Sequence, residues 1–215
     1  MIKNKLVIFS WSMYDLANTA FSALFVTFFF PLFIKNYLGG NEFHIGLVFG
    51  LSFLLAAVFV PIIGALSDAF GKRIPFVIFF TIGCVIVTGF VGFVALPIAL
   101  LLGFIANLFY HSALDVYDAL LTNISTSKTM GRISGYGVAL GYVGTILSLG
   151  MVFIILTTFG WDSKISIQYI FPAISIFYIT FSLFLFFNVK DKQKKKYNSC
   201  ICPICIEKRG NQKRQ

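Results

Sequence analysis

Two rows of polar side chains lie in segments that are otherwise apolar. The first row follows one helical face at spacings of four, three and four residues, and it consists of Trp11, Asp15, Asn18 and Ser22. The second row falls within about 80° around a helix that turns about 100° per residue, and it consists of Asn107, His111, Asp115, Asp118 and Thr122. An Asp near the centre of a bilayer costs roughly 3 kcal/mol unless it meets water or a partner. We therefore expect the two rows to line one hydrophilic pathway, with Asp15, Asn18, Asn107, His111, Asp115 and Asp118 contacting a solute or carrying protons.

A structural reading of the same residues stays open. Asp15 and Asp118 lie near one end of their segments, so either carboxylate can be solvated at the membrane surface or paired with Arg132. His111 lies deeper, which favours a functional role, although a histidine hydrogen-bonded between helices also fits.

Metal chemistry is a weaker reading of the second row. His111, Asp115 and Asp118 have the i, i+4, i+7 spacing of ligands on one helical face, but no H-E-x-x-H motif accompanies them. His44, the other histidine, lies at the opposite end of its segment. We expect no metal and no cofactor, and the absence of a nucleophile–base pair argues against an enzyme.

The elements that carry these rows are membrane helices. The chain is 58% hydrophobic and 12% charged, with 27 Phe in 215 residues and a mean hydropathy of +0.89. A spanning helix needs roughly 20 apolar residues. Six stretches meet that length, at about residues 9–34, 45–66, 75–96, 98–121, 133–159 and 167–187. We predict an all-α membrane protein with six transmembrane helices and no cleaved signal peptide, in which the third and sixth helices face lipid on most sides.

The basic residues predict the orientation of the bundle. If both termini are cytoplasmic, 15 of the 17 Lys and Arg fall on the inner side, and Lys35 and Lys164 remain outside. Nine of the 17 lie in the last 26 residues, so the net charge of +9 indicates topology and a lipid surface, not nucleic acid.

Two further patterns concern how the helices meet. The short segment from Gly64 to Arg73, which includes Asp68, Gly71 and Lys72, is expected to form a tight reversal between two helices. The fifth helix carries small residues at Gly137, Gly141 and Gly144, a spacing that lets a neighbouring helix approach closely. Arg132 begins that helix and is grouped with these packing residues.

Three motifs together resemble one family of transporters. Residues 64–73 match the G-x-L-x-D-x-x-G loop, followed by two basic residues, between helices two and three of the major facilitator superfamily. Residues 11–21 (W-S-M-Y-D-L-A-N-T-A-F) look like the opening of its vacuole-effluxer-like branch, which includes autophagy-related amino-acid effluxers of fungal vacuoles and bacterial relatives. Residues 131–142, beginning G-R-I-S-G, are similar to a third element of that branch. The resemblance covers residues 6 to about 190.

This resemblance implies two six-helix bundles and transport of a small solute by alternating access, with the first and fourth helices lining the cavity. It also implies a gating role for Asp68 and its loop. Members have about twelve helices, so residues 1–189 correspond to an amino-terminal half. We expect it in the cytoplasmic membrane, moving a solute such as an amino acid beside a second six-helix half or a second copy of itself. A truncated or non-transporting assembly subunit is the alternative.

Residues 190–215 differ in composition from the bundle. A run of lysines precedes Cys200, Cys202 and Cys205, and no fourth ligand for a closed zinc site lies nearby. We expect a disordered cytoplasmic tail with free thiols. One hypothesis is that the lysine run marks a slipped reading frame.

Overall fold

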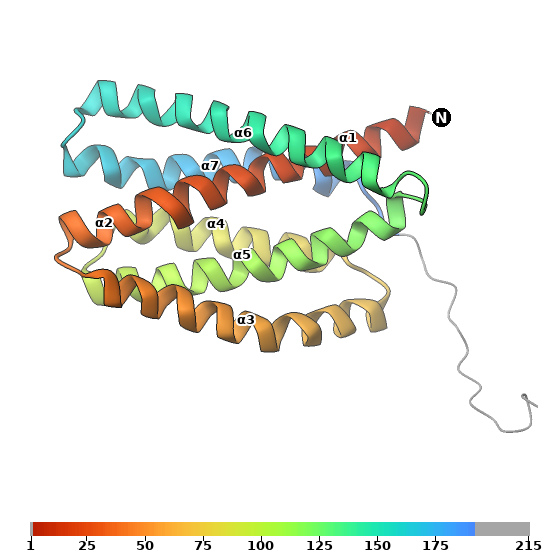
Figure 1. Ribbon diagram of the computed structural model, residues 1–215, viewed down its shortest axis with the longest axis horizontal. Coiled ribbons are helices and arrows are strands. Elements are labelled where there is room, and N and C mark those ends of the chain that lie inside the picture. Colours follow the sequence, from red (N-terminus) through yellow and green to blue (C-terminus); the bar gives the residue numbers. More distant parts are fainter. Residues whose placement is uncertain (1, 192–215) are drawn as a thin grey trace, which may run out of the picture.

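The computed structural model describes residues 2–191, with side chains from residue 5 onward. These residues form six helical rods, each long and apolar enough to cross a membrane, and consecutive rods run in opposite directions (Figure 1). In chain order the rods are α1 (Ile2–Phe21) continued by η1 (Ser22–Phe29) and α2 (Phe30–Tyr37), α3 (Glu42–Phe70), α4 (Ile74–Phe90) continued by η2 (Val91–Phe93), α5 (Leu96–Ile124), α6 (Met130–Phe159) and α7 (Lys164–Asn188). The predicted all-α fold with six spanning helices is confirmed.

Local sequence signals set several of the helix ends. Asn41 begins α3 through a capping box, in which its Oδ1 accepts the backbone N–H of His44 at 3.1 Å. Pro75 and Pro97 lie in the first turns of α4 and α5, where a missing N–H costs nothing. These signals account for short connections between long apolar helices.

The segment from Gly64 to Arg73 differs from the predicted reversal. Helix α3 continues through Gly64 and Asp68 to Phe70, and only residues 71–73 form the turn. Backbone amides near a bilayer need partners within the chain, which favours extending the helix as far as possible. The helix ends at Gly71, whose φ of 65° lies in the left-handed region that glycine adopts without strain.

The first rod is longer than predicted and is not uniform. It spans residues 2–37, and its middle section, Ser22–Phe29, is a π-helix. Runs of π-helix are rare and widen the helix locally. Pro31 follows in the first turn of α2, where the regular α-helix resumes.

The packing of the rods shows which spans are most covered within these six helices. Helix α1 packs mainly on α6 and α7, α4 packs between α5 and α7, and α3 lies mainly against α5. Helices α4 and α7, which correspond to the predicted third and sixth spans, keep exposed apolar side chains but are more buried than α3 and α6, the least buried spans. An evenly apolar sequence did not distinguish these degrees of burial.

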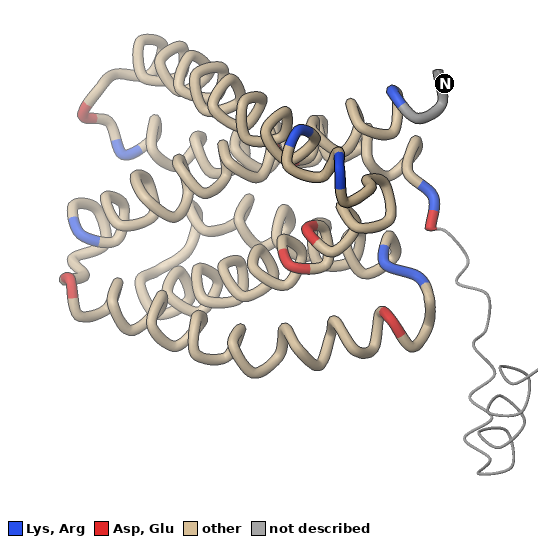
Figure 2. The backbone as a smooth tube through the Cα atoms, turned by 45° about the vertical axis from the view of Figure 1, so that its right-hand side comes forward, with Lys and Arg blue, Asp and Glu red and all other residues tan. Residues whose placement is uncertain are grey.

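Most of the charged residues lie at the ends of the rods, and a few acidic ones lie along them, as Figure 2 shows. The N-terminus, the α3–α4 and α5–α6 connections and the end of α7 lie at one end of the bundle (Figure 1). That end therefore holds Lys5, Lys72, Arg73, Lys128, Arg132 and Lys190, whereas Lys35 and Lys164 lie at the other.

Candidate functional site

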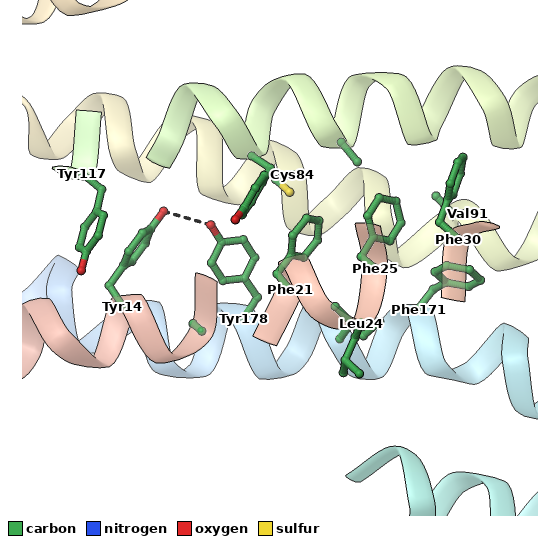
Figure 3. Packing of buried hydrophobic residues seen from close by; sticks show 14 of the residues in the cluster. Tyr14, Phe21, Leu24, Phe25, Phe30, Cys84, Val91, Tyr117, Phe171 and Tyr178 are labelled. Atoms are coloured by element: carbon green, nitrogen blue, oxygen red, sulfur yellow. Dashed lines mark hydrogen bonds between the residues drawn. The ribbon is translucent and has the colours of Figure 1, made fainter. Parts of the chain in front are cut away.

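Tyr14 on α1 connects three helices in the middle of the bundle through hydrogen bonds. Its hydroxyl lies 2.7 Å from Thr81 Oγ1 on α4 and 3.1 Å from the hydroxyl of Tyr178 on α7 (Figure 3). The Tyr178 hydroxyl also donates to Asn18 Oδ1 at 3.3 Å. All four side chains are buried. A phenol in an apolar interior needs such partners, so one α1 residue fixes α1 against both α4 and α7.

Aromatic rings continue this contact to α5. The ring of Tyr117 stacks on Trp11 at 4.8 Å between centroids and lies 4.5 Å from the ring of Tyr14. Its hydroxyl donates to the backbone oxygen of Trp11 at 2.9 Å. The sequence reasoning did not select Tyr14, Tyr117 or Tyr178 as site residues. The sequence did offer one signal for Tyr14: it is a tyrosine directly before Asp15 in an apolar helix, where its hydroxyl needs a hydrogen-bond partner.

Asp15 lies where α1 packs on α6. Its side chain is half-buried, and a Cβ added at Gly137 would stand 2.7 Å from Asp15 Oδ2 and 2.7 Å from the Trp11 ring. Asp118 on α5 lies within electrostatic range of both Asp15 and Asp115. Asp115 and Asp118 are exposed within this six-helix unit. The structure thus brings carboxylates from α1 and α5 to one face.

His111 lies on the same helix, about one turn before Asp115. Its ring is half-buried and stands 4.8 Å from the Phe53 ring on α3 and 4.9 Å from the Tyr110 ring. The surroundings of this imidazole are mainly aromatic, and α3 thereby contributes to the face that α1 and α5 form.

The two predicted asparagines lie inside helix contacts. Asn18 accepts the Tyr178 bond described above, and Asn107 Nδ2 donates to Ser52 Oγ on α3 at 2.6 Å. Asn107 is fully buried, and its Oδ1 has no partner among the described residues. The structure gives these amides helix-to-helix contacts and separates them from the exposed carboxylates.

The glycines of α6 form its contact with α1. Gly137 and Gly141 face Asp15, Trp11 and Thr19, and a Cβ at Gly144 would collide with the backbone of Leu16. This close approach follows the general use of small residues between membrane helices. Arg132, which was grouped with them, is exposed at the start of α6 and forms no ion pair with a described residue.

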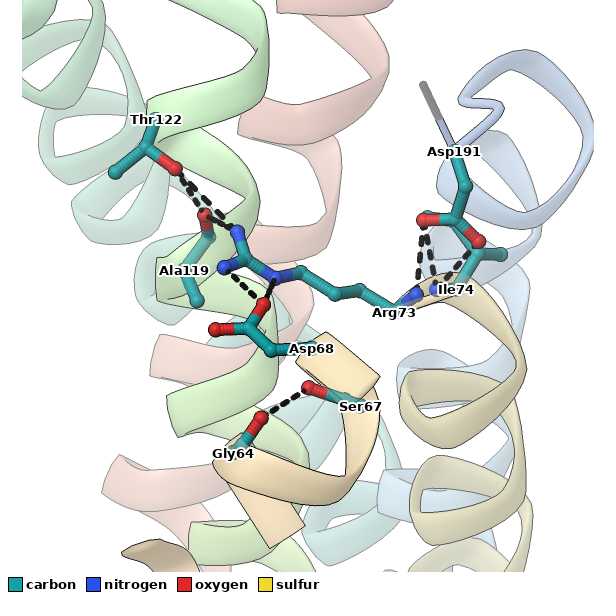
Figure 4. A network of polar contacts seen from close by, with 8 residues as sticks. All are labelled: Gly64, Ser67, Asp68, Arg73, Ile74, Ala119, Thr122 and Asp191. Carbon is teal, nitrogen blue, oxygen red and sulfur yellow. Dashed lines mark hydrogen bonds and ion pairs between the residues drawn. The ribbon is translucent and has the colours of Figure 1, made fainter. Parts of the chain in front are cut away.

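Arg73 forms a polar clasp at the α3–α4 turn, shown in Figure 4. Its guanidinium donates to Asp68 Oδ1 from Nη2 at 2.8 Å and from Nε at 3.2 Å, and to the carbonyl oxygen of Ala119 on α5. Asp191 beyond α7 accepts the backbone N–H of Arg73 at 2.9 Å. The clasp therefore joins α3, α4, α5 and the end of α7.

The other residues of the predicted gating segment are less engaged. Lys72 is exposed, and a Cβ added at Gly64 would meet nothing within 4 Å. Among residues 2–191, no group of three or more His, Cys, Asp or Glu is placed to hold a metal ion. The predicted tail cysteines, Cys200, Cys202 and Cys205, lie outside the described residues.

Comparison with protein families decides the class of the chain. The model of the Major Facilitator Superfamily matches residues 13–199, which is most of the sequence. The chain belongs to the Major Facilitator Superfamily. Membership of a superfamily of membrane transporters agrees with the six helices of the described residues that are long and apolar enough to span a membrane.

Two curated relatives are similar over part of their length. The "Uncharacterized MFS-type transporter YxiO" of Bacillus subtilis (strain 168) is 30% identical over 148 residues, which is 64% of this chain and 35% of that protein. An "Uncharacterized protein" of Aquifex aeolicus (strain VF5) is 32% identical over 145 residues, which is 65% of this chain and 36% of that protein. The match thus spans about a third of each relative. No solved structure matches significantly.

Proposed function

We propose that this superfamily member moves a small solute through a pathway bordered by α1 and α5. The observation that supports this most strongly is the set of three carboxylates on these helices, which lie within electrostatic range of one another and form no ion pair with a described residue. Such groups are costly inside a membrane and mark solute or proton routes. Asp15, Asp115 and Asp118, with His111, are the residues that contact solute or exchange protons.

The proposed solute carries a positively charged group, as an amino acid does. Carboxylates without paired cations attract an ammonium group by direct charge attraction. The resemblance of residues 11–21 to the vacuole-effluxer-like branch supports the same class. Proton exchange at the carboxylates would couple movement of the solute to a proton gradient.

The proposed working unit contains a second set of six helices. Transporters built from repeats place the solute between their two halves, and this chain supplies one wall of such a site. Its least buried helices, α3 and α6, flank α5 and α1 and are available for contact. We propose that residues 1–189 form the amino-terminal half in the cell membrane, with both termini cytoplasmic, beside a separate second half or another copy.

A non-transporting subunit is the second candidate. The curated relatives are much longer than the matched stretch, so a single six-helix unit does not reproduce their full arrangement. Purification under mild conditions separates the candidates. A companion polypeptide or a second copy in fixed stoichiometry supports transport by a complete cavity, and a lone chain without uptake supports the subunit reading.

Uptake into proteoliposomes tests the pathway directly. The probes are radiolabelled lysine, leucine and glutamate, with and without an imposed proton gradient. We expect Asp15→Asn to reduce uptake of the transported probe at least tenfold, because α1 loses its carboxylate on the shared face. His111→Ala should reduce uptake less, since the carboxylates remain.

Asp162→Asn is the matched control, because Asp162 is exposed in the α6–α7 connection at the opposite end of the bundle from the α3–α4 turn. It should transport as the wild type does. Equal rates for wild type, Asp15→Asn and His111→Ala would remove these residues from the pathway.

A further inference from the structure

A cavity at the basic end of the bundle lies apart from the carboxylate face. Its volume is about 780 Å³, and it is bounded by the start of α1, the α5–α6 connection and the first three turns of α6. None of Asp15, His111, Asp115 or Asp118 lines it, and no acidic residue does. The cavity is therefore a positively charged region distinct from the proposed pathway.

Two cations stand at this cavity without ion pairs. Lys5 and Arg132 both line it and are exposed, and among residues 2–191 the ion pairs are Lys35–Glu42 and Arg73–Asp68. Helix α6 also begins here, so the positive end of its dipole adds to the local field. These features favour an anion.

The remaining walls are apolar, which distinguishes the kind of anion. Phe9 and Tyr136 line the cavity and are 47% and 54% exposed, and Leu140 extends the wall along α6. A small hydrated ion gains nothing from such walls, whereas an acyl chain buries them. The basic end of the bundle is also the level at which lipid headgroups lie.

We propose that this cavity binds the phosphate of an anionic phospholipid. Lys5 and Arg132 contact the phosphate, and the acyl chains cover Phe9, Tyr136 and Leu140. Because the site lies where α1, α5 and α6 meet, a bound lipid would join the end of the pathway helices to α6. This proposal holds whichever solute the protein moves.

Native mass spectrometry of the purified full chain tests this proposal. Phosphatidylglycerol and phosphatidylcholine with identical acyl chains are titrated separately. Phosphatidylglycerol should bind more tightly, and Arg132→Gln and Lys5→Gln should each weaken it about fivefold, the effect of one basic side chain near an anionic headgroup. Phosphatidylcholine binding should change less than twofold.

The matched control is Lys128→Gln, which removes a charge from the same α5–α6 connection but does not line the cavity. It should leave phosphatidylglycerol binding within twofold of wild type. Equal affinity for the two lipids, or equal losses from Lys128→Gln and Arg132→Gln, would overturn the proposal.

Two more measurements are needed. The first distinguishes a lipid phosphate from a soluble one, and the second distinguishes a loss of binding from a loss of folding. Glycerol 3-phosphate carries the headgroup charge without acyl chains, and it should not displace the lipid at millimolar concentration. Displacement would show a site for a soluble anion and overturn the lipid assignment. Arg132→Lys keeps the charge and should retain binding. Loss of binding in both Arg132 variants, with lowered melting temperatures in phosphatidylcholine, would assign Arg132 a structural role instead.

Discussion

Tyr14 and Asp15 are neighbours in the chain, yet they face opposite environments. The Tyr14 hydroxyl is buried and bonded to α4 and α7, while Asp15 lies half-buried beside Gly137 and forms no ion pair with a described residue. The difference suggests two roles for one helix. Tyr14 fixes the bundle through satisfied hydrogen bonds, whereas Asp15 is the residue that we propose meets the solute.

The same contrast recurs at the α3–α4 turn. Arg73 is bonded to three other elements, whereas its neighbour Lys72 is exposed. At the same end of the bundle, Arg132 has no ion pair among the described residues. Arg73, with its several partners, joins the helices of the fold, whereas the exposed Arg132 is the residue that we propose contacts lipid.

The largest expected loss of stability comes from removing Tyr14, the α1 residue that is hydrogen-bonded to α4 and α7. Tyr14→Ala removes a fully buried ring that contacts Tyr117 and Tyr178, together with its hydrogen bonds. We expect a loss of about 3–5 kcal/mol in the free energy of unfolding. Denaturation in detergent followed by circular dichroism measures it. Tyr142→Ala, at an exposed position on α6, should change stability by no more than about 0.5 kcal/mol. Equal losses would show that the Tyr14 cluster has no special role.

A smaller effect is expected where α6 meets the other face of α1. Gly144→Ala places a methyl group against the Leu16 backbone, which cannot move as a flexible side chain can. This should cost about 1–3 kcal/mol through overpacking. Gly135→Ala on the same helix meets nothing within 4 Å and should be neutral or stabilise by up to about 1 kcal/mol. The opposite signs of the two changes can be read from paired melting curves, and the same sign in both would contradict the close α1–α6 contact.

The third effect concerns the clasp. Arg73→Lys keeps the charge but loses the forked geometry that reaches Asp68 and the Ala119 carbonyl together. Because Asp68 is about half exposed, the expected loss is only about 1 kcal/mol. Lys72→Gln serves as the comparison and should have little effect. Proteolysis at the α3–α4 turn would report the loosening more sharply than global unfolding, and unchanged cleavage in Arg73→Lys would show that the clasp is not needed.

Local sequence patterns predicted the six helices and several contacts. The row containing Asp15 and the row containing Asp118 were each visible from helical spacing, and the small residues of α6 indicated a close neighbour. The helices and the close α1–α6 contact are confirmed, because each depends on residues within one helix, whereas the role of the two polar rows stays a prediction.

Other features depend on residues far apart in the chain. The Tyr14–Thr81 and Tyr14–Tyr178 bonds join positions 67 and 164 residues apart, which no spacing rule relates. Asn107 shares the helical spacing of the predicted pathway residues, but its side chain bonds to Ser52 on α3, a residue far away in the sequence. The sequence also did not show that α3 and α6 are less buried than α4 and α7, because lipid and protein interiors accept the same apolar side chains.

Cysteine accessibility tests the central claim most directly. The tail cysteines are replaced by Ser, which leaves Cys84, a fully buried thiol, as the internal control. Single cysteines are then placed at positions 15, 111, 115 and 118 and treated with a membrane-impermeant maleimide from each side. All four should react while Cys84 does not. If all four are sealed from both sides, or if Cys84 reacts as fast as they do, the carboxylate face does not border an aqueous route.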